Sequence, residues 1–81
     1  MPLQNCPVGE WTTIPPVVGG DMLLESRGMG FYVSTEVVPP TDPGEGYALA
    51  SNAAMVIAAT LPVAVQPAQD IFSVNAYSEA V

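Results

Sequence analysis

The chain has 81 residues, with one basic residue against eight acidic ones and no histidine. A net charge of −7 opposes binding to nucleic acid, which depends on cationic side chains that neutralise phosphates, and it also opposes binding to anionic membrane surfaces. Histidine is the commonest general acid–base residue and the commonest transition-metal ligand. We therefore expect no catalysis, no metal and no cofactor.

The front of the chain, residues 1–9, shows no strand pattern and is rich in proline. It is expected to be an extended N-terminal arm that lies against another subunit or a larger shell through Leu3 and Val8, or else a disordered tail. Cys6 is the only cysteine, so an internal disulfide is impossible. We expect a small buried or unreactive thiol, with an intermolecular disulfide as the alternative.

Residues 10–14 form the first strand candidate, which ends at two consecutive prolines that cannot donate ladder hydrogen bonds. This segment carries Trp11, the only tryptophan. Tryptophan is enriched at interface hot spots, so Trp11 is a candidate interface residue. In a chain with few aromatic residues, a position close to the core is the stronger expectation.

Two strands are expected next, over residues 21–26 and 30–37. In the first, Met22 and Leu24 share one face. The second, FYVSTEV, is aromatic and β-branched, as strands prefer. The glycines between them suit a tight turn, and the two strands are therefore predicted to pair as a hairpin.

Residues 38–46, VPPTDPGEG, are expected to be a surface loop because they combine three prolines with two glycines. The loop carries Asp42 and Glu45. Two carboxylates are too few for a calcium loop, which needs more oxygen ligands at defined spacings. A solvated acidic loop is the better interpretation.

No charged residue lies between Glu45 and the aspartate at position 70. This stretch is predicted to hold a short strand at residues 47–49, a turn at 51–52, a second strand starting at residue 55, and a turn at 67–69. A helix is an alternative for its middle part. A membrane span at residues 47–65 is a further alternative, opposed by an internal proline and by the lack of flanking basic residues.

Residues 70–78 are predicted to be the last strand, followed by a tail at 79–81. The alternation of apolar and polar residues there has a period of two. One core is predicted, with Trp11 close to it, and its members are Phe31, Val33, Val56, Phe72 and Val74.

Turn signals recur about every ten residues, which is typical of all-β sandwiches and barrels. The sequence therefore predicts a small single-domain antiparallel β-sandwich or barrel over residues 10–81, preceded by the extended arm. A domain of this size buries a limited share of its surface, so oligomerisation or docking onto a larger partner is expected to add stability.

The order of these features resembles that of small all-β virion proteins of tailed bacteriophages. The features are WTTI at residues 11–14, GFYVSTE at 30–36, GYAL at 46–49 and DIFSVNAYS at 70–78. This family includes capsid decoration (cement) proteins and tail or fibre accessories. No single functional residue is carried over from it.

The resemblance implies a non-enzymatic structural protein of the virion, assembled in the host cytoplasm. The expected role is that of a capsid decoration protein that binds and stabilises the outer head surface. Its partners would be copies of itself, with a homotrimer as one arrangement, and a major capsid or tail protein, without nucleic acid or membrane. The alternatives are a tail, baseplate or fibre accessory, and a small membrane protein with the span at residues 47–65.

Overall fold

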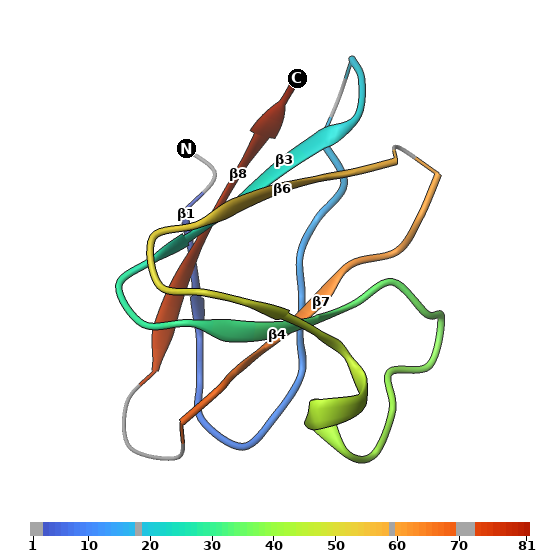
Figure 1. The fold of residues 1–81 in the computed structure, drawn as a ribbon. Helices are drawn as coiled ribbons and strands as arrows, with labels where there is room; N and C mark the ends of the chain where they lie inside the picture. The colour runs from blue at the N-terminus through green and yellow to red at the C-terminus, as the bar shows by residue number, and fades with distance from the viewer. Residues whose placement is uncertain (1–2, 18, 59, 70–72) are drawn as a thin grey trace.

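Two four-stranded antiparallel sheets pack face to face in the computed structural model, which describes residues 3–17, 19–58, 60–69 and 73–81 (Figure 1). In sheet order, the first sheet contains β1 (Leu3–Cys6), β8 (Val74–Ala80), β3 (Met22–Arg27) and β6 (Ala54–Ile57). The second contains β2 (Thr12–Thr13), β7 (Ala64–Pro67), β4 (Phe31–Ser34) and β5 (Tyr47–Leu49). The predicted all-β sandwich is confirmed.

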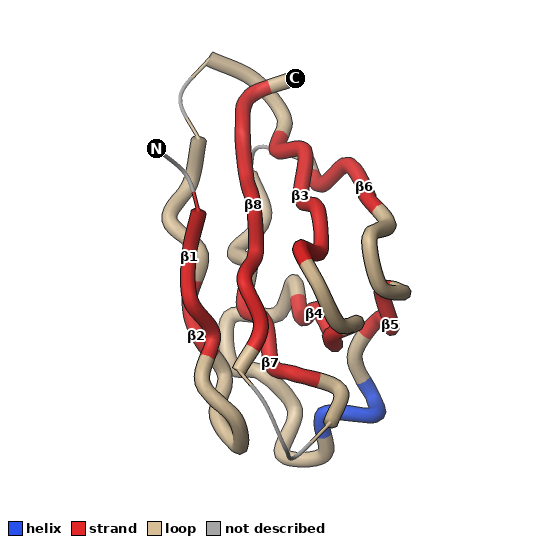
Figure 2. The backbone as a smooth tube through the Cα atoms, turned by 90° about the vertical axis from the view of Figure 1, so that its left-hand side faces the viewer, coloured by secondary structure: helices blue, strands red, loops and turns tan. Residues whose placement is uncertain are grey.

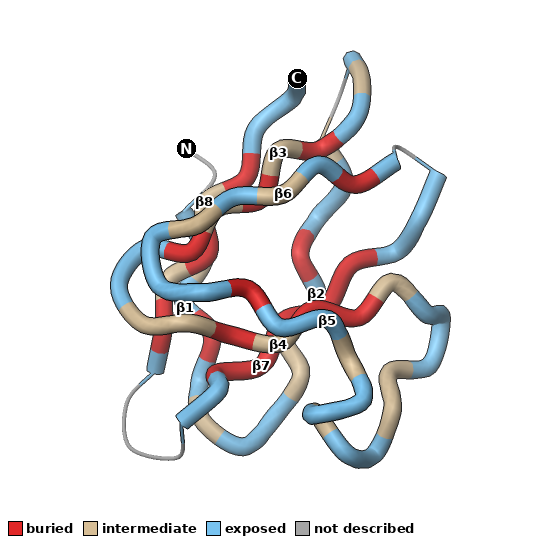
Figure 3. The backbone as a smooth tube through the Cα atoms, in the orientation of Figure 1, coloured by how far each residue is buried: buried red, intermediate tan, exposed pale blue. Residues whose placement is uncertain are grey.

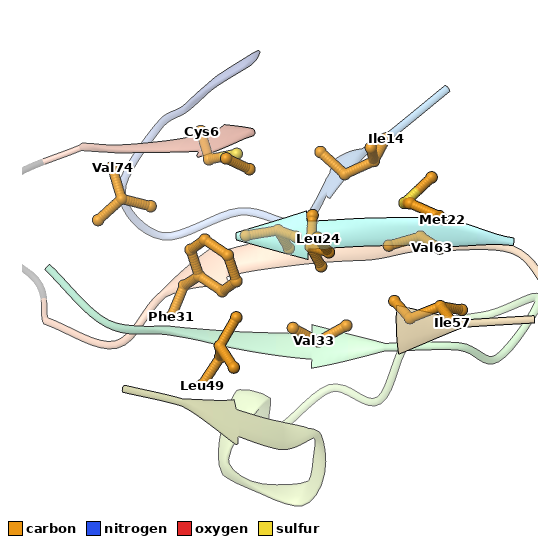
Figure 4. Close-up of a cluster of buried hydrophobic side chains, with 12 residues drawn as sticks. Cys6, Ile14, Met22, Leu24, Phe31, Val33, Leu49, Ile57, Val63 and Val74 are labelled. Carbon is orange, nitrogen blue, oxygen red and sulfur yellow. The ribbon is translucent and has the colours of Figure 1, made fainter. Parts of the chain in front are cut away.

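The core lies between the sheets, and several strands contribute alternate residues to it (Figure 4). In β3 the side chains of Met22 and Leu24 are buried, while Leu23 between them is half-buried, as a period of two requires. Phe31 and Val33 come from β4, and Val74 comes from β8. These three are buried, so this part of the predicted core is confirmed.

One predicted core residue is wrong. Val56 is 57% exposed, whereas its neighbour Ile57 is buried against the core. Both residues are apolar and β-branched, so the sequence pattern did not distinguish the two possible faces of β6. Phe72, which was also predicted in the core, lies outside the described residues.

The expected N-terminal arm is also wrong for residues 3–6, which form β1. This strand pairs antiparallel with β8, from Leu3 opposite Tyr77 to Cys6 opposite Val74. Cys6 is fully buried in the core cluster. The front of the chain is thus an edge strand of the sandwich, because β8 offers it a ladder that is distant in sequence.

The predicted hairpin of residues 21–26 and 30–37 is replaced by a crossing between sheets. β3 pairs with β6 and β8, whereas β4 pairs with β5 and β7. The turn between them, where Gly28 has a φ of +105°, carries the chain from one sheet to the other. Glycine adopts this backbone conformation at little cost. Of the consecutive strands, only β4 and β5 pair with each other among the described residues.

A polar clasp joins this turn to the turn between β5 and β6, which also crosses between the sheets. The buried Ser26 hydroxyl donates to the Met29 carbonyl at 3.1 Å and accepts from the Asn52 N–H at 3.2 Å. The Ser51 hydroxyl donates to the carbonyl of Gly28. The clasp links the two crossing turns to each other by hydrogen bonds.

The uncharged middle of the chain forms strands, as the leading interpretation predicted. β5 and β6 lie where strands were expected, with a turn at residues 51–52 between them. The sequence interpretation missed β7, whose last residue, Pro67, was expected to start a turn. All four β7 residues are buried, which is typical of a strand covered on both faces. The described parts of the chain contain no helix with the length and apolar character of a membrane span.

Candidate functional site

Each sheet has two edge strands, and one edge of the first sheet lies on the same side of the molecule as one edge of the second. β6 ends the first sheet and β5 ends the second, and both lie at the same side of the sandwich in Figure 2, away from β1 and β2. Both strands include exposed residues, as Figure 3 shows. This side of the sandwich is open, and we call it the open side.

The outer edge of β6 presents unpaired backbone groups. The Ser26 N–H donates to the Ala53 carbonyl at 2.9 Å, which marks this pair as hydrogen-bonded. Bonded and non-bonded pairs alternate along an antiparallel ladder, so Met55 and Ile57 use their backbone groups toward β3. The N–H and C=O groups of Ala54 and Val56 therefore point away from the sheet.

A groove with a volume of about 370 Å³ lies on the open side. We call it the lateral groove. Met55 lines it from β6, and Val33 and Tyr47 line it from the second sheet. Tyr47 has the same parity along β5 as the buried Leu49, so it lies on the core-facing side of its sheet. It is nevertheless 61% exposed, because no described residue of the chain covers it there.

The rim of the lateral groove is acidic. Glu36 and Glu45 both line it, and both are exposed. The only basic residue of the chain, Arg27, does not line the groove. It is ion-paired with Glu25 and stacks on the Tyr77 ring, with its guanidinium carbon 4.3 Å from the ring centre. The negative charge at the groove is therefore not compensated by a basic side chain lining it.

Trp11 holds the loop that forms this rim. Its indole N–H donates to the Pro40 carbonyl at 2.9 Å, and its ring lies beside Gly46. A Cβ at Gly46 would come within 2.8 Å of the Val33 carbonyl oxygen and 3.3 Å of the Trp11 ring, so glycine permits the close approach. Within this loop, η1 (Pro43–Glu45) is a short 3-10 turn that Asp42 caps by accepting from the Gly44 N–H at 3.0 Å.

A second hollow, with a volume of about 380 Å³, opens at one end of the sandwich. Most of its lining residues are apolar, and they include Ile14, Met22 and Val63 from the core. Val37 and Leu61 stand exposed at its mouth, with Val37 88% exposed. This hollow adds to the apolar surface of the molecule but has no carboxylate in its lining.

The three predicted interface residues do not form one site. Leu3 is half-exposed on β1, and Val8 is half-buried in the turn that follows β1. Trp11 is half-buried, is not among the partly buried residues that pack against the core cluster, and contacts the loop at the rim of the groove through its hydrogen bond to Pro40. The sequence interpretation missed Tyr47, Met55 and Glu36. The sequence signal that could have indicated this site is the segment of β6, which has neither charge nor proline, in a chain with acidic turns. That β5 and β6 lie on the same side of the sandwich is shown only by the order of the strands in the sheets.

Cys6 is a buried free thiol, as predicted. Burial raises its pKa to about 11 and outweighs the hydrogen bonds with the Thr12 side chain and the Ala76 backbone, which lower the pKa. A neutral buried thiol is a poor nucleophile. In the part of the chain that the structure describes, Cys, Asp and Glu side chains nowhere gather in threes as a metal site would require.

Comparison with known proteins identifies no relative: neither a family model, nor a curated protein, nor a solved structure matches this chain.

Proposed function

We propose that this chain is a non-enzymatic structural protein of a tailed-bacteriophage virion, acting as a capsid decoration protein that binds and stabilises the outer head surface. The observation that carries the proposal is the open side, where two uncovered edge strands flank a groove with an exposed core-facing tyrosine. Proteins normally protect such edges with charges, prolines or covering loops. An uncovered edge is suited to attachment to another protein.

The distribution of charge agrees with a position on the outside of a shell. Eight acidic residues against one basic residue would be repelled by packaged DNA. The apolar hollow at the end of the sandwich offers a further contact surface for a neighbouring copy or a shell subunit. A small protein with surfaces suited to binding other proteins fits a component that is present in many copies.

Fractionation of virus particles tests this proposal. Lysates from the cells that produce the virus are separated on a density gradient into filled particles, empty heads and tails, and the chain is quantified in each. We expect it in filled particles and in empty heads at the same ratio to the major shell protein. Recovery with tails alone would support the tail, baseplate or fibre accessory instead. Recovery only as free protein would refute both virion roles.

A further inference from the structure

We propose that the lateral groove receives an extended segment of a different protein, which adds a strand to β6 and carries apolar side chains followed by lysine or arginine. This inference deepens the proposed function, since it states the chemistry of the segment to which the chain attaches. Its three parts, the backbone, the apolar contact and the charge, are supported by different observations.

The backbone of β6 is prepared to accept a strand. Ala54 and Val56 direct their N–H and C=O groups outward, and β6 contains neither a charge nor a proline that would prevent pairing. Strand addition at a sheet edge gives affinity through these main-chain groups. β6 has four residues, so a segment of about four to six residues can pair along it.

The apolar part of the segment would fill the space that this chain leaves open. Tyr47 faces the core side of its sheet but is 61% exposed, and Met55 lies across the groove on β6. In a strand paired to β6, alternate side chains point into the groove. An aliphatic side chain there would cover Tyr47 and Met55 and remove apolar surface from water.

Charge decides which polypeptide can occupy the groove. Glu36 and Glu45 at the rim favour a basic side chain beside the apolar ones. A second copy of this chain would have to supply that cation from Arg27, its only basic residue. Arg27, the last residue of β3, already pairs with Glu25 and stacks on the ring of Tyr77 in β8. The occupant is therefore a different protein.

Peptide binding to the purified full chain tests the inference. The probe is a short fluorescein-labelled peptide in which valines alternate with threonines and two arginines follow. Fluorescence anisotropy should show saturable binding. A peptide with the same arginines but with prolines in place of the threonines cannot donate to the β6 carbonyls, and it should bind much more weakly.

Two variants locate the binding site. Val56→Pro removes an N–H that points away from β3, a position where an edge strand tolerates proline, and should weaken probe binding at least about tenfold. Glu36→Gln combined with Glu45→Gln should weaken it about fivefold. Glu10→Gln combined with Glu79→Gln changes the net charge equally at exposed sites outside the groove and should leave binding unchanged. Circular dichroism and thermal melting confirm that each variant is folded.

Three results would overturn the inference: no saturable binding of the probe, equal weakening by the groove and control charge variants, or β6-dependent dimerisation of the chain without probe binding. The Val56→Pro variant in particle fractionation separates this inference from the proposed function. If the variant still occupies heads, the chain attaches by another surface and only the groove inference fails. If the probe binds in the groove but the chain is absent from particles, only the virion role fails.

Discussion

The buried thiol of Cys6 makes the free energy of unfolding depend on pH in the alkaline range. Its thiol is fully buried, and its pKa rises from 9.0 in an open chain to about 11 in the folded protein. Folding therefore favours the neutral thiol. The contribution is complete below the unfolded pKa and is lost as the pH rises from about 9 toward about 11, because the unfolded chain then releases a proton that the folded chain retains.

We predict that the free energy of unfolding falls by on the order of 2 kcal/mol over this pH range because of Cys6 alone. Urea denaturation on either side of the range measures the fall. Tyr77 also has a raised pKa, because its hydroxyl donates a hydrogen bond to the Glu79 carboxylate, so the wild type alone is not sufficient. Cys6→Ala is the control, and its pH slope should be shallower. Equal slopes would contradict the prediction.

Ser26 is the buried centre of the clasp between the two crossing turns. Ser26→Ala would leave the Met29 carbonyl and the Asn52 N–H without this partner. We predict a loss of about 1–3 kcal/mol in unfolding free energy, measured by urea denaturation. Ser51→Ala removes an exposed hydroxyl from the same clasp and should cost much less, since water replaces its hydrogen bond. Similar losses for the two variants would contradict the prediction that the buried Ser26 hydroxyl contributes more to stability than the exposed Ser51 hydroxyl.

At the scale of the element, the register of β6 decides which of two adjacent β-branched residues supports the core. Ile57 is buried opposite Met22, while Val56 is largely exposed opposite Leu23. Ile57→Ala should cost about 2–5 kcal/mol because it leaves a cavity. Val56→Ala should remain within about 0.5 kcal/mol. Thermal melting of the two variants measures the difference, and a larger effect at Val56 would indicate that the strand is shifted by one residue.

The register of β6 also determines which of its side chains lines the lateral groove. If β6 were shifted by one residue, Val56 would enter the core, and Met55 would leave the groove for the outer face. Trp11 fixes the opposite wall through its hydrogen bond to Pro40, while Gly46 lets the loop approach β4. The two walls of the lateral groove are therefore positioned by different contacts: β6 by its pairing with β3, and the loop by Trp11.

At the scale of the whole molecule, the two ends of the described chain are paired with each other. β1 covers the edge of β8, and Cys6 fills the core beside it. We predict that deletion of residues 2–8 unfolds the protein or lowers its melting temperature by many degrees, because it opens the core and exposes a central strand. Leu3→Ser, at a half-exposed position of the same strand, should change melting only slightly. A deletion variant with unchanged melting would show that β1 is dispensable.

The sequence by itself determined which residues form strands and which faces they bury in much of the molecule. Alternation with a period of two placed Met22 with Leu24 and Phe31 with Val33 on the core side, and β5 and β6 in the chargeless middle were correctly predicted as strands. Proline and glycine indicated the loop before β5. These features follow from local chemistry, since each depends on residues that are neighbours in the chain.

Only the tertiary structure decided which strands pair, and therefore where the open side lies. A backbone ladder has the same N–H and C=O groups whatever its partner, so β3 and β4 looked like a hairpin although each pairs with strands distant in sequence. Residues 3–6 became a strand because β8 is available to them, with Leu3 opposite Tyr77. Tyr47 and Met55 meet across a groove because each sheet ends there, and sheet order is a property of the folded chain rather than of any local segment.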